Sequence, residues 1–78
     1  MARLRLFAQA RDAAGTANDV VDGSTVGAVL GTARERYGER FAAVLGTSAV
    51  WVNGEPADDA TPVGERDEVA VLPPVSGG

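Results

Sequence analysis

Apolar and charged side chains alternate at the start of the chain. The segment 3–8 places apolar residues at every second position, which is the period-two pattern of a half-buried strand. We expect Leu4, Leu6 and Ala8 on the buried face and Phe7 on the other. An aromatic side chain at Phe7 would either pack under a loop or form part of a docking surface.

A turn and a second strand are predicted next. Gly15 lies in the polar segment 11–16, which favours a turn, and residues 19–22 form a short strand pattern that ends at Gly23. The first two strands would then form a hairpin.

The middle of the chain changes to a helical period. Ser24 is a suitable N-cap, and Gly38 is expected to end the helix. Gly27 and Gly31 each cost about 1 kcal/mol relative to alanine, so this helix depends on packing against the sheet. One face carries the apolar residues Val26, Val29, Leu30, Ala33 and Tyr37.

A short second helical turn is expected to fill the core after this helix. Phe41, Val44 and Leu45 would supply its apolar side chains, and Gly46 would end it.

The last third of the chain returns to strand patterns. Residues 49–52 are followed by Asn53-Gly54, a strong hairpin signal because both positions tolerate positive φ. Glu55 and Pro56 would begin a return strand at a sheet edge, and residues 68–72 predict the final strand. The fold class is therefore α+β, with a mixed sheet covered on one face by a helix over residues 1–72.

Residues 73–78 predict an extended tail. Pro73 and Pro74 restrict φ and favour a stiff, extended backbone, whereas Gly77 and Gly78 carry no Cβ and leave the last carbonyl unhindered. At about 3.3 Å per residue, such an arm reaches roughly 20 Å into a partner. The alternative is a frayed terminus.

Composition narrows the function. The 78 residues make one small domain without His or Cys, which removes the commonest general base, the best nucleophile and the main soft metal ligands. A net charge of −4 disfavours nucleic acid as a partner. No signal segment or membrane-length apolar run is present, so we expect a cytoplasmic protein without a membrane or metal site.

Asp58 and Asp59 form a pair of adjacent carboxylates in the acidic loop 57–67. Paired acids suggest metal binding or acid/base chemistry, but without His and a third ligand we expect ordinary solvated surface.

Three motifs carry a resemblance to a known family. They are Leu6-Phe7-Ala8-Gln9-Ala10-Arg11 followed by Gly15-Thr16, then Asp67-Glu68-Val69-Ala70, and the ending Pro73-Pro74-Val75-Ser76-Gly77-Gly78. The chain resembles the MoaD/ThiS family of ubiquitin-like sulfur carriers, and within it the small subunits of molybdopterin synthase. The resemblance implies a ubiquitin-like β-grasp fold.

The resemblance also implies a function. In such proteins a MoeB-like adenylating enzyme activates the terminal carboxylate with ATP and magnesium, and a sulfur donor then displaces AMP to leave a glycine thiocarboxylate. The chain itself would bind no cofactor. Its tail would enter a MoaE-like large subunit, which holds the catalytic side chains and converts precursor Z, a cyclic pyranopterin monophosphate, into molybdopterin for molybdenum cofactor biosynthesis. The chain would thus be a sulfur-donating subunit without catalytic side chains of its own.

Residue roles follow from the matched motifs. Gly78 would be the adenylate and thiocarboxylate site, and Phe7 and Arg11 would dock the partner, which favours the docking interpretation of Phe7. The segment expected in the partner's channel is Pro73, Pro74, Val75, Ser76 and Gly77. Val71-Leu72 depart from the family pattern, in which an aromatic residue is common.

Three alternatives stay open. A sibling carrier would supply sulfur for thiamine, cysteine or a secondary metabolite with the same tail. A ubiquitin-like modifier would attach Gly78 to lysines of target proteins, because acyl transfer to an amine shares the activation step. A plain interaction module would use the sheet face and leave the tail inert.

Overall fold

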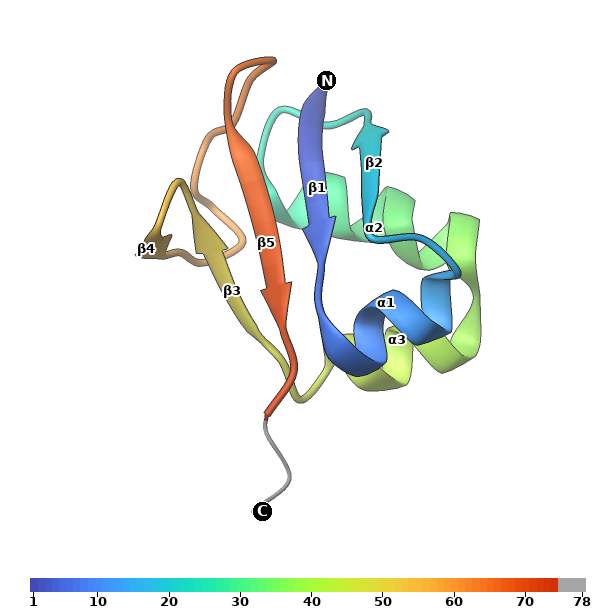
Figure 1. Ribbon diagram of the computed structural model, residues 1–78. Helices are drawn as coiled ribbons and strands as arrows, with labels where there is room; N and C mark the ends of the chain where they lie inside the picture. The colour runs from blue at the N-terminus through green and yellow to red at the C-terminus, as the bar shows by residue number, and fades with distance from the viewer. Residues whose placement is uncertain (75–78) are drawn as a thin grey trace.

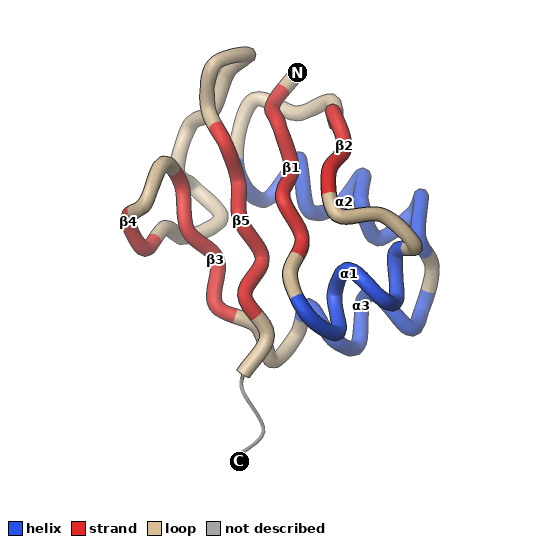
Figure 2. The backbone as a smooth tube through the Cα atoms, in the orientation of Figure 1, coloured by secondary structure: helices blue, strands red, loops and turns tan. Residues whose placement is uncertain are grey.

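The computed structural model describes residues 1–74 as a five-stranded sheet with three helices (Figures 1 and 2). The elements are β1 (Ala2–Leu6), α1 (Ala8–Ala14), β2 (Asn18–Val21), α2 (Val26–Tyr37), α3 (Glu39–Leu45), β3 (Ala49–Val52), β4 (Glu55–Pro56) and β5 (Glu68–Leu72). Within these residues, no helix has the length and apolar character needed to cross a membrane.

The first and last strands, β1 and β5, lie side by side inside the sheet. The strand order is β2-β1-β5-β3-β4, with β1 parallel to β5 and the other neighbours antiparallel. Leu4 pairs with Val69 and Val50 pairs with Val71, which sets the apolar positions of three strands on one face. The predicted mixed α+β sheet is confirmed.

The core lies between this apolar face and the helices. α2 runs behind the sheet in Figure 2, and α1 and α3 pack beside each other near the carboxyl ends of β1 and β5. The largest fully buried side chains are Phe41, Leu4, Leu6, Val21, Val26, Val29, Val69 and Val71. Among residues 1–74, the opposite face of the sheet carries the alternate residues of each strand and no helix (Figure 2).

The sequence predicted the face and the end of α2 correctly but misplaced its N-cap. Thr25 is the N-cap residue, with an extended backbone and its Oγ1 accepting a hydrogen bond from the Ala28 amide at 3.1 Å. Ser24 was the predicted cap, but its carbonyl accepts from the Val63 amide at 3.0 Å, which ties Ser24 to the 57–67 loop between β4 and β5. Gly38, at φ 93°, ends the helix as expected.

The predicted antiparallel pairing of the first two strands is confirmed, but the predicted turn between them is wrong, because a helix joins them. The carbonyl of Phe7 accepts from the amides of Ala10 and Arg11 at 3.0 and 3.3 Å, which starts α1 directly after β1. Ala8 is therefore exposed at the start of a helix with φ 49°, instead of buried in a strand. Gly15, at φ 78°, ends α1 and its amide donates to the Arg11 carbonyl.

The elements after α2 follow the prediction closely. α3 buries Phe41 and Leu45, and the ring of Tyr37 meets Phe41 edge to face at 5.1 Å between centroids. Asn53 and Gly54 adopt φ values of 50° and 85°, which confirms the hairpin turn into the edge strand β4.

Candidate functional site

The predicted tail leaves the domain from the middle of the sheet. β5 is bordered by β1 and β3, so the chain that follows it starts from a strand held on both sides (Figure 1). Pro73 is still buried in the domain, and Pro74 is exposed. The expected stalk thus begins with an anchored proline, and its exposed part begins at Pro74.

Four predicted site residues, Val75, Ser76, Gly77 and Gly78, lie outside the described residues. Their roles stay predictions.

Phe7 lies beside the start of the tail. Its backbone amide donates a hydrogen bond to the Val71 carbonyl, with 3.3 Å between N and O. Its ring is half-buried, and the guanidinium carbon of Arg5 lies 5.2 Å from the ring centroid, which is a cation–π distance. Arg5 in turn lies 4.0 Å from the Glu68 carboxylate. The ring is therefore held in place from the sheet side.

Arg11 is brought to the same corner by α1. The helix places it one turn after Phe7, and its amide donates to the Phe7 carbonyl at 3.3 Å. Its side chain is exposed. The structure thus places both predicted docking residues near the carboxyl end of β5, through a helix that the sequence pattern did not predict.

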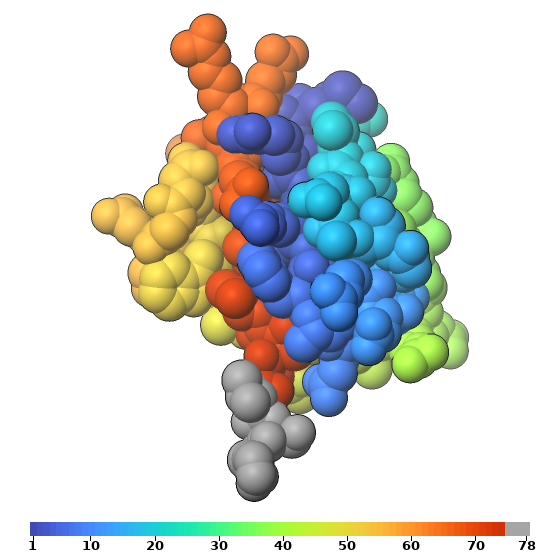
Figure 3. Space-filling view, viewed as in Figure 1, coloured from blue at the N-terminus to red at the C-terminus, as the bar shows by residue number. Residues whose placement is uncertain are grey.

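Trp51 and Leu72 extend this corner across the open face of the sheet, which Figure 3 views directly. Trp51 pairs with Ala70 in the sheet register, and Leu72 pairs with Ala49. Ala70 and Leu72 alternate along β5 with Val69 and Val71, which face the core. Trp51, opposite Ala70, therefore lies on the same open face as Leu72, and both large side chains are partly exposed. The sequence interpretation passed over them as site residues, although the alternation of Trp51 with Val50 and Val52 could have indicated a side chain on the open face.

Asp67 and Glu68, two residues of the family resemblance, have structural contacts. Asn53 Nδ2 donates to Asp67 Oδ1 at 2.8 Å, and the Gly64 amide donates to Asp67 Oδ2 at 2.8 Å. The hydrogen bond from Asn53, and next that from Gly64, lower the pKa of Asp67 below its usual value. The Glu68 amide donates to Asn53 Oδ1 at 2.9 Å. This network joins the β3–β4 turn to the start of β5, and so fixes the strand that feeds the tail.

The paired acids of the 57–67 loop are exposed, as expected. Asp58 Oδ1 accepts from the Ala60 amide at 3.0 Å, and the Asp59 carbonyl accepts from the Gly27 amide at 2.9 Å. Both therefore shape the loop over the start of α2.

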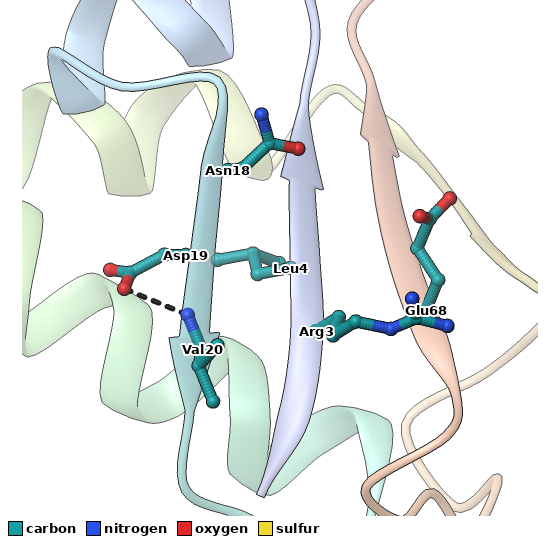
Figure 4. Close-up of a pocket in the computed structure, with 6 residues that line it drawn as sticks. All are labelled: Arg3, Leu4, Asn18, Asp19, Val20 and Glu68. Carbon is teal, nitrogen blue, oxygen red and sulfur yellow. Dashed lines mark hydrogen bonds between the residues drawn. The ribbon is translucent and has the colours of Figure 1, made fainter.

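A shallow hollow lies at the other end of the sheet (Figure 4). It is lined by Arg3, Leu4, Asn18, Asp19, Val20 and Glu68. The one β5 residue in this lining, Glu68, is the first residue of that strand, whereas the tail follows its last residue, Leu72.

Known proteins support the architecture. The family model described as "ThiS family" matches residues 4–78 of this chain. No curated protein matches this chain. The crystal structure of SAMP1 from Haloferax volcanii is 32% identical, covers 97% of both chains and has a TM-score of 0.81. The ubiquitin-like β-grasp fold implied by the resemblance is thereby confirmed.

Two solved structures of more distant sequence share the fold. One is the protein-protein complex of subunits 1 and 2 of molybdopterin-converting factor from Helicobacter pylori, at 24% identity and a TM-score of 0.74, covering 99% of this chain and 97% of that chain. The other is the BexX/CysO complex of Amycolatopsis orientalis, at 20% identity and a TM-score of 0.83, covering 100% of both chains. Because the family model spans nearly the whole sequence, the chain belongs to the ThiS family of ubiquitin-like sulfur carriers and modifiers.

Proposed function

We propose that this chain is the sulfur-carrier small subunit of a molybdopterin synthase, with Gly78 as the residue that carries sulfur. The observation that carries the proposal is the continuity of β5 with the Pro73-Pro74 stalk, within a family match that extends to Gly78. A strand held on both sides gives a fixed starting point for an arm that must reach into another protein.

The chemistry at Gly78 follows from the properties of a carboxylate. A carboxylate is a poor electrophile, so one of its oxygens first attacks the α-phosphorus of ATP on a MoeB-like enzyme with magnesium, and pyrophosphate leaves. Hydrosulfide supplied by the sulfur donor then attacks the acyl carbon, AMP leaves and the sulfur loses its proton, which gives the thiocarboxylate. Gly77 and Gly78 suit this step because neither carries a Cβ that would crowd the acyl carbon.

The catalytic side chains belong to the partner in this proposal. The sequence has no His and no Cys, and the arm of a small domain supplies only its terminal group. A MoaE-like large subunit would receive the tail and convert a cyclic pyranopterin monophosphate into molybdopterin in the cytoplasm. The solved complex of the two Helicobacter pylori subunits supports a partner of this kind.

The corner around Phe7 is the docking surface of the proposal. Phe7 and Trp51 offer partly exposed aromatic area, and Arg5 and Arg11 add positive charge next to the exit of the tail. Aromatic residues and arginines are enriched among the residues that dominate binding energy at protein interfaces. A partner that contacts this corner would hold the domain so that the arm enters its channel.

A protein modifier is the second candidate. The similarity to SAMP1, small archaeal modifier protein 1, favours it. The same activated Gly78 would then be joined to lysine amines of target proteins. All seven cationic residues of this chain are arginines, so it has no lysine amine to which the Gly78 of another copy could be joined.

A complementation experiment in the native host separates these functions. A strain that lacks the chain receives either the wild-type chain or a variant without Gly78. The proposal expects molybdopterin to be absent from the strain, restored by the wild type and not by the variant, without any requirement for added thiamine or cysteine. Normal molybdopterin with loss of lysine-linked conjugates would assign the chain to the modifiers, and a requirement for thiamine or cysteine would assign it to a sibling carrier.

A further inference from the structure

β2 lies at an edge of the sheet, where a strand usually offers unpaired backbone groups to another chain (Figure 2). Its register with β1 determines which groups these are. The Leu6 amide donates to the Ala17 carbonyl at 2.8 Å, so every second residue from Ala17 onward bonds to β1. The N–H and C=O groups of Asn18 and Val20 therefore point away from the sheet.

Each of these four outward groups has a side-chain partner. The Val20 carbonyl accepts from Arg36 Nη1 at 3.2 Å, and the Val20 amide donates to Asp19 Oδ1 at 2.8 Å, as the dashed line in Figure 4 shows. The Asn18 carbonyl accepts from Thr16 Oγ1 at 2.9 Å, and the Asn18 amide donates to the same oxygen at a longer 3.4 Å. Local side chains thus occupy the positions that a neighbouring strand would take.

The side chains that bond the outward groups of Val20 are anchored on α2. Arg36 Nη1 lies 2.8 Å from Asp19 Oδ2, and the Tyr37 hydroxyl donates to the same carboxylate. Because the guanidinium bonds both the carboxylate and the Val20 carbonyl, the ion pair holds the Arg36 side chain over the edge.

The other edge is closed by a different means. Ala57 donates to the Val50 carbonyl at 3.0 Å, so in the β3–β4 pairing Pro56 is the β4 residue that faces outward. Proline has no N–H to offer. Within the described sheet, both edges are therefore blunted, and β2 is the one that relies on side chains.

We propose that Thr16, Asp19 and Arg36 form an edge cap that keeps β2 from adding a strand, and that its removal makes β2 the docking site for β2 of a second copy of this chain. In an antiparallel pair about a two-fold axis, Asn18 of one copy faces Val20 of the other, and all four outward groups of each edge find partners. Val20 is 50% exposed and would bury apolar area in that pair. The charge of Asp19, opposite its own copy, adds repulsion to the cap.

The test compares two full-length variants with equal net charge. Thr16→Val, Asp19→Ala and Arg36→Met together remove the cap hydroxyl, the carboxylate that accepts from the Val20 amide, and the guanidinium. Asp22→Asn with Arg34→Met makes the same change in charge at exposed positions outside the cap and serves as the control. Light scattering after size exclusion gives the mass of each from micromolar to millimolar concentration, and circular dichroism checks cooperative unfolding.

The proposal expects the wild type and the control to remain at 8.0 kDa and the cap variant to double its mass as concentration rises. Adding Val20→Pro to the cap variant removes the outward N–H and should restore the monomer. A folded cap variant that stays monomeric, or a dimer unaffected by Val20→Pro, overturns the proposal. If the cap variant does not unfold cooperatively, a second removal of the same three side chains, Thr16→Ala with Asp19→Ala and Arg36→Leu, carries the same expectation, and a monomer there overturns it equally.

Discussion

The backbone amide of Phe7 donates a hydrogen bond to the carbonyl of Val71, with 3.3 Å between N and O. This bond joins the corner residue of the proposed docking surface to the strand that feeds the tail. Pro73, two residues after Val71, is still buried. The distance from the docking corner to the start of the arm is therefore set by the sheet, so a partner that holds Phe7 also fixes where the arm begins.

Phe7→Ala should weaken binding to the large subunit by about 2 kcal/mol, which is roughly a 30-fold higher Kd, because a partly exposed aromatic side chain is lost from the interface. Isothermal titration calorimetry with the purified large subunit measures the change. Val20→Ala is the control, since Val20 is exposed on the edge strand β2 and away from the tail. Equal affinities for Phe7→Ala and the wild type would remove Phe7 from the interface.

Acid should weaken the attachment of β2 to α2. Hydrogen bonds from Tyr37 and then Arg36 lower the pKa of Asp19 below its usual value of 3.8. Because the pKa of Asp19 is lower in the folded than in the unfolded protein, its carboxylate adds to the free energy of unfolding above pH 3.8. This contribution is lost as the pH falls below 3.8. Asp19→Asn should cost roughly 1–3 kcal/mol at neutral pH and flatten the acid slope.

Urea unfolding between pH 7 and pH 2 tests this expectation, with Asp22→Asn as the control for charge. Part of the slope should persist in Asp19→Asn, because the pKa of Asp67 is lowered as well. An acid slope identical in Asp19→Asn and the wild type would contradict the role of Asp19.

Alkali should release the same contact from the side of Tyr37. Burial and the Asp19 carboxylate raise the pKa of Tyr37 from 10.0 to about 12. Because the pKa of Tyr37 is higher in the folded than in the unfolded protein, its neutral hydroxyl adds to the free energy of unfolding below pH 10. This contribution is lost as the pH rises towards about 12. Tyr37→Phe removes this titration, so its unfolding free energy should change less over that range. Absorbance titration measures the ionisation of Tyr37, and circular dichroism shows whether the protein is still folded at each pH. Ionisation near pH 10 in the folded protein would contradict the raised pKa of Tyr37.

Two glycines of α2 should respond differently to the same substitution. A Cβ at Gly31 meets nothing within 4 Å, so Gly31→Ala should stabilise the protein by about 0.5–1 kcal/mol. A Cβ at Gly27 would lie 3.1 Å from Asp59 Cβ and 3.2 Å from the Asp59 carbonyl oxygen, where the loop crosses the helix start. Gly27→Ala should therefore be about 1 kcal/mol less stable than Gly31→Ala. Thermal unfolding of both variants decides the matter, and equal midpoints would refute the close approach.

The parts of the fold that rest on local patterns were predictable from the sequence. Asn53-Gly54 favours a hairpin turn by its own backbone preferences, and the spacing of Val26 to Ala33 marks a helix face whatever it packs against. The order of the strands was predictable only as far as β1 and β5 being apolar enough to lie inside the sheet.

α1 escaped prediction because its seven residues carry no apolar stripe. Its sequence is alanine-rich and polar, and Ala10 is the one residue of the helix that is fully buried. The helix starts at Ala8 in a left-handed conformation that only the surrounding structure can impose. The position of Phe7 and Arg11 at one corner depends on this helix. The contacts of Arg36 and Tyr37 with Asp19 were equally hidden, since they join residues 17 and 18 positions apart.

Intact-protein mass spectrometry of the chain purified from its native host tests the central claim most directly. The carrier function predicts a species about 16 Da heavier, from replacement of one oxygen by sulfur, and fragmentation should place the gain on Gly78 instead of on Met1, where oxidation would add a similar mass. The carrier function would be contradicted if free chains carried only a carboxylate at Gly78 while other copies were joined through Gly78 to lysines of other proteins.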